Sequence, residues 1–301
     1  MKILITGGSG FIGSHIAEHF VGEAEVRILD NLRTGKRENL TGLDVHFTEG
    51  SILDRDLVRE CIAGVDYVFH LAAMVSVPES VEDPEGCFAL NVDGLRIVLE
   101  EAAQAKVRKL VLSSSAAIYG DDPIVPKRET MRATPKSPYA ETKFAGEVLC
   151  QAFTDAGNLE TTSLRYFNVF GPRQDPASAY AAAVPIFIQQ ALASKPITIY
   201  GDGEQTRDFV YVKDVVSANA FAAQHEGVTG PHNVGYGERL SILELAQMIL
   251  KLTGSTSQIM FQPERAGDVK HSMAAVGKLW KAGWKPTSSL ASGLREMLPI
   301  P

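Results

Sequence analysis

Short apolar runs alternate with longer segments of helical spacing through most of the first two thirds of the chain. The runs have the length of β-strands and cover residues 3–5, 26–29, 45–47, 67–69, 110–112 and 162–164. Strands that alternate with helices form right-handed βαβ units, which build a parallel sheet with helices on both faces. We therefore predict an α/β fold with a doubly wound parallel sheet of the Rossmann type.

This alternation ends after about residue 170. Glycine-containing turns break the later chain into shorter pieces, although helical spacing persists around 178–194, 212–226 and 240–253. We expect a Rossmann domain over residues 1–170, to which residues 212–235 return, and a smaller, discontinuous C-terminal α/β substrate domain over 171–301. Ligands of open α/β sheets bind at the carboxyl ends of the strands, so the active site should lie between the two parts.

Charge and cysteine content exclude several classes of protein. The net charge of −7 argues against a surface for nucleic acid or an anionic membrane. The three cysteines are odd in number and lack CxxC spacing, so we expect neither a disulfide scaffold nor a bound metal. The sequence has no apolar run near the roughly 20 residues that span a bilayer, and from its first residues we expect no cleavable signal. We expect a cytoplasmic protein without nucleic-acid or membrane partners.

A glycine-rich turn lies between the first predicted strand and the first predicted helix. Gly7, Gly10 and Gly13 allow a tight turn, a close approach of backbone to pyrophosphate, and tight packing of helix on strand. The helix N-terminus then presents N–H groups to the phosphates. Asp30 ends the second strand, where a carboxylate accepts the hydroxyls of an adenosine ribose and repels a 2′-phosphate. The pattern predicts NAD as the cofactor.

Two observations keep the cofactor prediction open to alternatives. Arg33 and Lys36 follow Asp30 closely, and either cation could hold the 2′-phosphate of NADP. The alternative without a cofactor is that residues 6–30 contain only a glycine-rich turn followed by a solvated aspartate.

Three further residues have the spacing of a catalytic set. Tyr139 and Lys143 lie one helical turn apart in a segment that begins as a helix, with proline in its first turn. A phenol with a pKa of about 10 is a poor base, but a nearby ammonium and a positive nicotinamide ring both favour the phenolate. Ser115 ends a run of serines after the strand at 110–112, where its hydroxyl can relay a proton to Tyr139. A tyrosine and a lysine at this spacing are often only a surface pair, and a run of serines after a strand is often only a turn. Together with the glycine-rich turn, the three residues predict a Ser–Tyr–Lys site.

These motifs give the chain a family resemblance. It resembles the extended short-chain dehydrogenase/reductases that act on nucleotide sugars, of the UDP-glucose 4-epimerase type. The resemblance runs from residue 1 to about 280, and its motifs keep the family's order and spacing: TGGSGFIGSH (6–15), LDN (29–31), HLAA (70–73), NVDG (91–94), SSSAAIYGD (113–121), SPYAETK (137–143), RYFNVFGPRQ (165–174), GDGEQTRDFVYVKD (201–214), NVGYG (233–237) and RAGDV (265–269).

The resemblance implies a role for each matching residue. It implies that NAD contacts Gly7, Gly10, Phe11, Ile12, Gly13, Asp30, Asn31, Leu71, Ala72, Ala73, Asn91, Tyr139 and Lys143. It implies that a UDP-sugar contacts Ser76, Ser115, Tyr139, Asn168, Arg207, Arg265, Asp268 and Ser272. Arg207 and Arg265 would hold the diphosphate, because a guanidinium fork binds phosphate through paired hydrogen bonds, while surface ion pairs are the alternative. His70 is explained equally well as a plain strand-end histidine.

The residues after Ser115 narrow the reaction type. Related 4,6-dehydratases carry an acidic pair there, and related decarboxylases keep an acid, whereas this chain has Ala116, Ala117 and Ile118. The resemblance therefore implies 4-epimerisation: Tyr139 takes the C4 proton, NAD takes the hydride to leave a transient 4-keto sugar, and the hydride returns to the opposite face. A UDP-uronate or UDP-pentose 4-epimerase, or a catalytically silent NAD-binding scaffold, are the alternatives.

The preferred sugar and the assembly also follow from the resemblance. The position that limits room for an N-acetyl group corresponds to Ser272, which is small, and Ser76-Val77-Pro78 resembles the UDP-N-acetylglucosamine branch. We expect interconversion of UDP-GlcNAc and UDP-GalNAc, with UDP-Glc and UDP-Gal as further substrates. Family members pair helices corresponding to 84–105 and 138–154 into a homodimer bundle. Burial of these apolar faces within one chain is the alternative.

Overall fold

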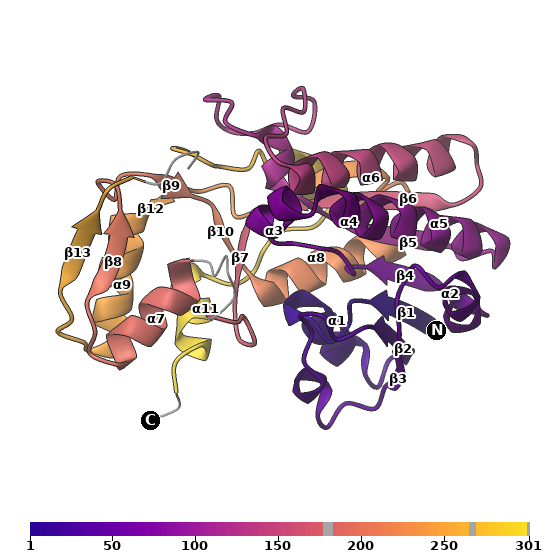
Figure 1. Cartoon of the computed structure of the whole chain (residues 1–301), viewed down its shortest axis with the longest axis horizontal. Helices are drawn as coiled ribbons and strands as arrows, with labels where there is room; N and C mark the ends of the chain where they lie inside the picture. The colour runs from indigo at the N-terminus through magenta and orange to yellow at the C-terminus, as the bar shows by residue number, and fades with distance from the viewer. Residues whose placement is uncertain (177–182, 265–268, 300–301) are drawn as a thin grey trace.

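Among the residues that the structure describes, seven parallel strands form the central sheet (Figure 1). The computed structural model describes residues 1–176, 183–264 and 269–299. The strands lie in the order β11-β6-β5-β4-β1-β2-β3, and their bounds are Lys2–Thr6 (β1), Glu25–Asp30 (β2), His46–Glu49 (β3), Tyr67–His70 (β4), Lys109–Ser115 (β5), Glu160–Tyr166 (β6) and Gly230–Val234 (β11). This confirms the doubly wound sheet. The strand order reverses between β1 and β4, which is where such sheets bind ligands.

The end of β5 differs from the sequence prediction. The serines were expected to follow the strand at 110–112, but β5 stays paired with β6 as far as Ser115, which lies opposite Tyr166. A search for apolar runs misses the last residues of β5, because their side chains are polar. Ser114 is nevertheless buried, and its hydroxyl is hydrogen-bonded to Glu147. Ser115 is therefore held by the sheet itself rather than by a loop.

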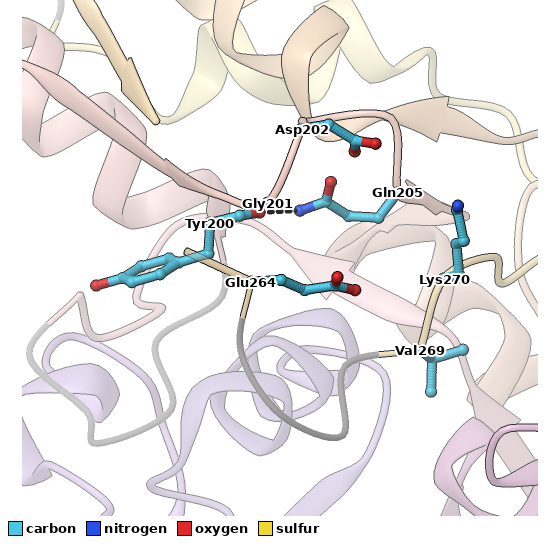
Figure 2. Close-up of a pocket in the computed structure, with 7 residues that line it drawn as sticks. All are labelled: Tyr200, Gly201, Asp202, Gln205, Glu264, Val269 and Lys270. Carbon is cyan, nitrogen blue, oxygen red and sulfur yellow. Dashed lines mark hydrogen bonds between the residues drawn. The ribbon is translucent and has the colours of Figure 1, made fainter. Parts of the chain in front are cut away.

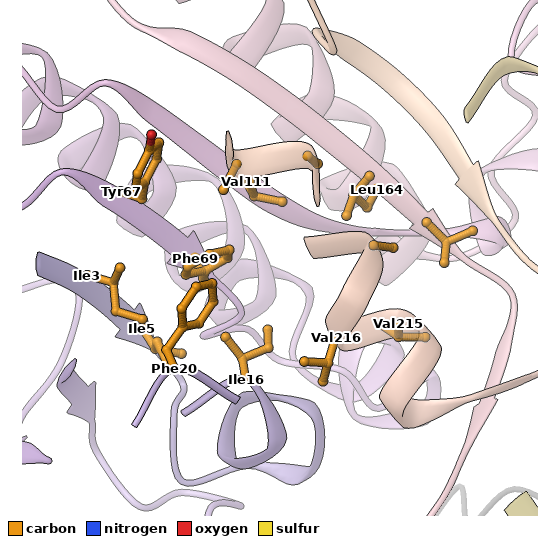
Figure 3. Packing of buried hydrophobic residues seen from close by; sticks show 14 of the residues in the cluster. Ile3, Ile5, Ile16, Phe20, Tyr67, Phe69, Val111, Leu164, Val215 and Val216 are labelled. Atoms are coloured by element: carbon orange, nitrogen blue, oxygen red, sulfur yellow. The ribbon is translucent and has the colours of Figure 1, made fainter. Parts of the chain in front are cut away.

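Helices cover both faces of the sheet. Side chains alternate along a strand, so Ile3 and Ile5 of β1 point to one face and Leu4 to the other. The helices α1 (Phe11–Phe20) and α8 (Val212–Gln224) pack on the face of Ile3 and Ile5, as the close view of Phe20, Phe69 and their neighbours shows (Figure 3). The helices α2 (Arg55–Ile62), α5 (Gly94–Gln104) and α6 (Pro138–Asp155) pack on the face of Leu4. The sheet is thus buried between two layers of helices.

A second, smaller part has its own hydrophobic core. It contains α7 (Ala183–Leu192), α9 (Ile242–Thr253) and α11 (Leu290–Glu296), with β8 (Ile197–Tyr200) parallel to β13 (Ile259–Gln262). Short strand pairs link it to the sheet: β7 (Asn168–Phe170) with β10 (Phe209–Tyr211), and β9 (Thr206–Arg207) with β12 (Leu240–Ser241). Figure 1 shows β7 and β10 at the junction of the two parts. The chain returns to the central sheet through α8 and β11. After β12, α9 and β13 of the second part, it returns once more, and α10 (Gly277–Ala282) packs on β11.

The helical stretch predicted at 84–105 is not one regular helix. It consists of α4 (Pro84–Phe88), a π-helical turn η2 (Ala89–Asp93) and α5, and a short helix α3 (Val77–Glu82) precedes it. Asn91 lies in the π-helical turn, a feature that is frequent at functional sites. Two 3₁₀ turns, η1 (Arg37–Leu40) and η3 (Ala116–Tyr119), complete the described helices. No helix in the described ranges is long and apolar enough to cross a membrane.

Candidate active site

The glycine-rich turn packs directly against the end of β4. Gly7 has a φ of +71°, and a Cβ atom on it would lie 2.7 Å from the backbone nitrogen of Ala72. A Cβ atom on Gly13 would overlap the carbonyl oxygen of Gly7. Gly10 is the N-cap of α1 and has no side chain to cover the first N–H groups of the helix, while Phe11 and Ile12 pack against the core of the second part. The turn therefore leaves backbone N–H groups open to phosphate oxygens.

Asp30 is fixed beside this turn at the end of β2. Its Oδ2 accepts a hydrogen bond from Ser9 N at 2.9 Å, and its Oδ1 accepts one from Leu32 N at 2.8 Å. Asn31 is exposed, and its Oδ1 accepts a hydrogen bond from Arg33 N. The hydroxyl of Ser9 is buried and has no hydrogen-bond partner in the part of the chain that the structure describes. A buried hydroxyl without a partner fits a position where a ligand oxygen completes its bonding.

The two cations near Asp30 are both engaged in ion pairs. Arg33 contacts Glu79 of α3, with 2.5 Å between NH2 and Oε1. Lys36 contacts Asp175, with 2.8 Å between Nζ and Oδ2. Each of the two cations that the sequence offered to a 2′-phosphate is thus bound to a carboxylate of the chain itself.

The loop after β4 lies next to the glycine-rich turn. Its first residues, Leu71, Ala72 and Ala73, follow His70, whose Nδ1 lies 2.9 Å from Thr6 Oγ1. Burial, helped by the charge of Lys143, lowers the pKa of His70 to about 3. His70 is therefore a neutral side chain that joins two strand ends.

Asn91 ties the same loop to α6. Its Oδ1 accepts a hydrogen bond from Met74 N at 2.7 Å, and its Nδ2 donates to Met74 O and to Thr142 Oγ1, both at 3.0 Å. Ser76 is the N-cap of α3 and accepts a hydrogen bond from Glu79 N. The structure gives Asn91 a supporting position between the loop and α6.

Ser115, Tyr139 and Lys143 come together at the end of β5. The N-cap Ser137 accepts a hydrogen bond from Ala140 N and so begins α6 just before Tyr139. The Nζ of Lys143 donates to the carbonyl oxygen of Ser113 at 2.9 Å and lies 5.8 Å from the centre of the Tyr139 ring. Ser115 shares a hydrogen bond with the Tyr139 hydroxyl, and its Oγ accepts one from Ala117 N. A phenol, an ammonium and a hydroxyl therefore share one site, an arrangement that is able to move a proton.

Burial acts on both titratable side chains of this site. In the protein alone it raises the pKa of Tyr139, and the hydrogen bond with Ser115 acts against this. Burial also lowers the pKa of Lys143 to about 8. Removal from water disfavours both charged forms. Burial thus favours the neutral phenol in the protein alone, and a positive charge brought by a bound cofactor would act in the opposite direction.

On the substrate side, three expected contacts lie close to one another. Asn168 donates to the carbonyl oxygen of Asp208 through both its backbone N (3.0 Å) and its Nδ2 (3.1 Å). Arg207 is half-buried on β9, and Ser272, also half-buried, donates its backbone N–H to Thr206 O at 3.1 Å. The other two expected contacts, Arg265 and Asp268, lie outside the described residues.

The sequence analysis missed Asp208, which organises this cluster. Its carboxylate is buried and accepts hydrogen bonds from the backbone N–H groups of Tyr236 (2.7 Å), Gly237 (3.0 Å) and Ala274 (3.0 Å). Burial raises its pKa to about 6, although the three donors act against this. The available signal was an aspartate directly before an apolar strand, beside a candidate phosphate-binding arginine.

A cavity of about 250 Å³ is lined by residues that lie close in sequence to Arg207 and Ser272. Figure 2 shows its lining residues, and a hydrogen bond of 2.7 Å joins Gln205 Nε2 to Tyr200 O. The lining combines polar, charged and aromatic side chains with backbone: Tyr200, Gly201, Asp202, Gln205, Glu264, Val269 and Lys270. Two of these residues flank the segment at 265–268.

Residues 3–235 match the model of the NAD dependent epimerase/dehydratase family. The chain belongs to this family. Its members are NAD-dependent, which agrees with the glycine-rich turn, Asp30 and the unpartnered hydroxyl of Ser9. These residues fit a dinucleotide, because Cβ atoms on Gly7 and Gly13 would overlap the chain's own backbone, and only glycine allows a turn tight enough to bring its N–H groups to a pyrophosphate.

Several proteins that resemble the chain over most of its length are UDP-sugar enzymes by name. The UDP-N-acetylglucosamine 4-epimerase of Methanobrevibacter ruminantium, solved with UDP-N-acetylmuramic acid, is 39% identical with a TM-score of 0.95, covering 98% of this chain and 96% of that one. The UDP-glucose 4-epimerase of Thermus thermophilus, solved with NAD, is 39% identical with a TM-score of 0.90, covering 99% and 97%. The UDP-N-acetyl-alpha-D-glucosaminuronate decarboxylase of Bacillus cytotoxicus is 39% identical over 276 residues, which are 87% of this chain and 83% of that protein. The family resemblance expected from the motifs is thus confirmed.

Proposed function

We propose that the chain is a UDP-hexose 4-epimerase with tightly bound NAD, acting on UDP-GlcNAc and UDP-GalNAc and also on UDP-Glc and UDP-Gal. The observation that carries this proposal is the convergence of Ser115, Tyr139 and Lys143 at the end of β5. The convergence lies at the carboxyl end of β5, which pairs with β4 beside the point where the strand order reverses.

Each side chain of this set has a separate task. When bound, NAD supplies the hydride acceptor and a positive charge near the phenol. Tyr139 takes the proton of the C4 hydroxyl, directly or through Ser115, and returns it after the sugar has turned over. Lys143 stays in place through its bond to the Ser113 carbonyl and adds positive charge. Arg207, on the substrate side, holds the diphosphate while the sugar rotates.

The residues after Ser115 favour epimerisation over loss of water or carbon dioxide. In the 3₁₀ turn η3, Ala116 and Ala117 stand where the resemblance places the acids of dehydratases and decarboxylases. An alanine can neither donate nor accept a proton. This distinction matters because a decarboxylase is among the chain's relatives.

The size of one side chain supports the choice of sugar. Ser272 is half-buried, and its backbone is bonded to Thr206, next to Arg207. A small residue there leaves room for a C2 N-acetyl group, although the space admits the smaller hexose as well. We therefore infer that N-acetylated and plain UDP-hexoses are both substrates.

The proposal includes a homodimer in the cytoplasm. Apolar side chains of α3, α4 and α6 are exposed, namely Val81, Phe88, Phe144 and Val148. Phe153, near the end of α6, packs against the chain's own core. The three cysteines are buried free thiols, which suits a reducing compartment.

The decisive experiment is proton NMR of purified protein with UDP-GlcNAc and no added cofactor. Appearance of UDP-GalNAc would support the reaction, the tightly held NAD and the N-acetyl tolerance together, and Tyr139→Phe should abolish it. Turnover of UDP-Glc alone would keep the mechanism and reject the argument from Ser272. Silence with both sugars, in protein that contains NAD, would reject this choice of substrates.

A further inference from the structure

The helix α6 presents a third polar side chain in line with Tyr139 and Lys143. Glu147 follows Lys143 by one turn, and both are buried against the sheet. Its carboxylate forms a two-pronged ion pair with Arg165 of β6, with 2.6 Å between Oε2 and NH2 and 2.9 Å between Oε1 and Nε. The side chains are only 6% and 4% exposed, so this pair is removed from water.

The ion pair holds the chain on both sides of Ser115. Before it, the Ser114 hydroxyl donates to Glu147 Oε1 at 2.6 Å. After it, Arg165 NH1 donates to the Tyr119 hydroxyl at 2.8 Å. Ser115 therefore lies between two residues that are bonded to the same buried pair.

The same contacts continue to the substrate side of the molecule. The Tyr119 hydroxyl donates to Asn233 Oδ1 at 2.6 Å, and Asn233 Nδ2 donates to Lys127 O at 2.8 Å. Lys127 in turn exchanges backbone hydrogen bonds of 2.8 Å with Met273 and Ala275, just after Ser272. One hydrogen-bonded series thus joins α6, the end of β5 and the segment that carries Ser272.

Stability alone is a poor explanation for such a pair. Removing two charges from water costs several kcal/mol each, and well-packed apolar side chains often replace a buried ion pair without loss of stability. Fixing the geometry of the site is a better explanation for the pair, because a misplacement of about 1 Å in an active site can lower the rate about 100-fold. Ser114 lies between Ser113, whose carbonyl oxygen accepts the hydrogen bond from Lys143, and Ser115, which is hydrogen-bonded to Tyr139.

We propose that Glu147, with Arg165, is a positioning residue that fixes the end of β5 for catalysis. It holds Ser114 so that the Ser113 carbonyl stays on Lys143 and the Ser115 hydroxyl stays on Tyr139. This inference rests on the proposed epimerase function.

The test removes the link to β5 and leaves the ion pair intact. Ser114→Ala deletes one hydrogen bond to Glu147, and we expect kcat to fall 5- to 20-fold while KM for the UDP-sugar stays within twofold. The Ser113 carbonyl stabilises the Lys143 ammonium, so a looser contact should move the alkaline limb of the kcat–pH profile to lower pH. Glu147→Gln should have a larger effect of the same kind, and Ser114→Ala remains informative if that variant fails to fold.

A control variant on the same helix separates positioning from stability. Thr154→Val also removes a partly buried hydroxyl, one that accepts from Thr161 N at 3.0 Å, but far from Tyr139 along α6. We expect it to leave kcat and the pH profile unchanged. An unchanged kcat in Ser114→Ala, or an equal fall in both variants, would overturn the inference while wild-type turnover upheld the epimerase. A wild-type protein without turnover would instead reject the proposed function, and the inference with it.

Discussion

At the scale of single residues, the burial of Lys143 opposes stability and serves the site. The residue is 6% exposed, and burial lowers its pKa from the ordinary 10.5 to about 8. Between those two pH values the unfolded chain holds the extra proton, so this residue's contribution to stability rises with pH. A shift of this size corresponds to a cost of about 3 kcal/mol for the buried charge at pH 7. Such a cost is typical of a residue kept for chemistry.

The first prediction uses this cost. Lys143→Met should raise the free energy of unfolding of the nucleotide-free protein by about 1–3 kcal/mol at pH 7 and lower turnover about a thousandfold. The gain in stability should shrink as the pH approaches 10, because the wild-type lysine then sheds its proton. Urea unfolding at pH 7 and pH 10 measures it. A destabilised variant at pH 7 would contradict the prediction.

The second prediction concerns the choice between NAD and NADP. Glu79 pairs with Arg33, close along the chain to Asp30, so Glu79→Ala should free a guanidinium that can meet a 2′-phosphate. An exposed ion pair contributes up to about 1 kcal/mol, and we therefore expect NADP affinity to rise about three- to fivefold, with NAD within twofold. Calorimetric titration of nucleotide-free protein measures both. Asp56→Ala, which breaks an exposed pair with Arg59 on α2, is the matched control, and an unchanged affinity ratio in Glu79→Ala would refute the idea.

At the scale of the elements, local signals predicted some parts of the molecule and missed others. The glycine-rich turn and the start of α6 were predictable, because the positive φ of Gly7 and the capping bond of Ser137 to Ala140 N are local in sequence. The polar end of β5, the π-helical turn around Asn91 and the burial of Asp208 were not. Each depends on partners distant in sequence, such as Glu147 for Ser114 and Ala274 for Asp208. The family motifs located Asn91 and Arg207 without giving these contacts.

The third prediction concerns the loops that Asp208 gathers. In Asp208→Asn, one amide NH₂ must face backbone N–H donors from Tyr236, or from Gly237 and Ala274, and an unsatisfied buried donor costs about 1–3 kcal/mol. We expect that loss in the free energy of unfolding, and a KM for the UDP-sugar raised about tenfold, because Arg207 precedes Asp208 directly. Thermal unfolding and initial rates measure the two effects. Asp44→Asn, on an exposed aspartate, should change neither, and an unchanged KM in Asp208→Asn would show that Arg207 does not depend on this cluster.

The pH dependence of Asp208 provides a second check on the same cluster. Its pKa is raised from 3.8 to about 6, so between those values the native state holds more protons than the unfolded chain. This contribution to stability is present below pH 3.8 and is lost as the pH rises to 6. Asp208→Asn should remove this dependence from the stability–pH curve. A curve of unchanged shape would contradict the assignment.

At the scale of the whole molecule, the site draws on both parts of the chain. The end of β5, the start of α6 and the glycine-rich turn belong to the sheet layer, whereas Arg207 and Ser272 belong to segments near the second core. The short strands β7 and β10 cross between the parts (Figure 1), and Asn168 and Asp208 lie on or beside them. The relative placement of the proposed catalytic and substrate-binding residues therefore depends on this junction. It is a property that no single motif encodes.

The last prediction concerns assembly. Val148 and Phe144 of α6 are 54% and 39% exposed, and α3 and α4, which carry Val81 and Phe88, pack beside this helix. A self-complementary apolar face is what a twofold dimer needs. We expect wild-type protein to run as a dimer in light scattering after size exclusion, and Val148→Glu to run as a monomer, because the dimer would bury two unpaired carboxylates. Leu192→Glu, at an exposed leucine on α7, should remain dimeric. A monomeric wild type would reject the face as an interface, and a dimeric Val148→Glu would place the interface elsewhere on the molecule.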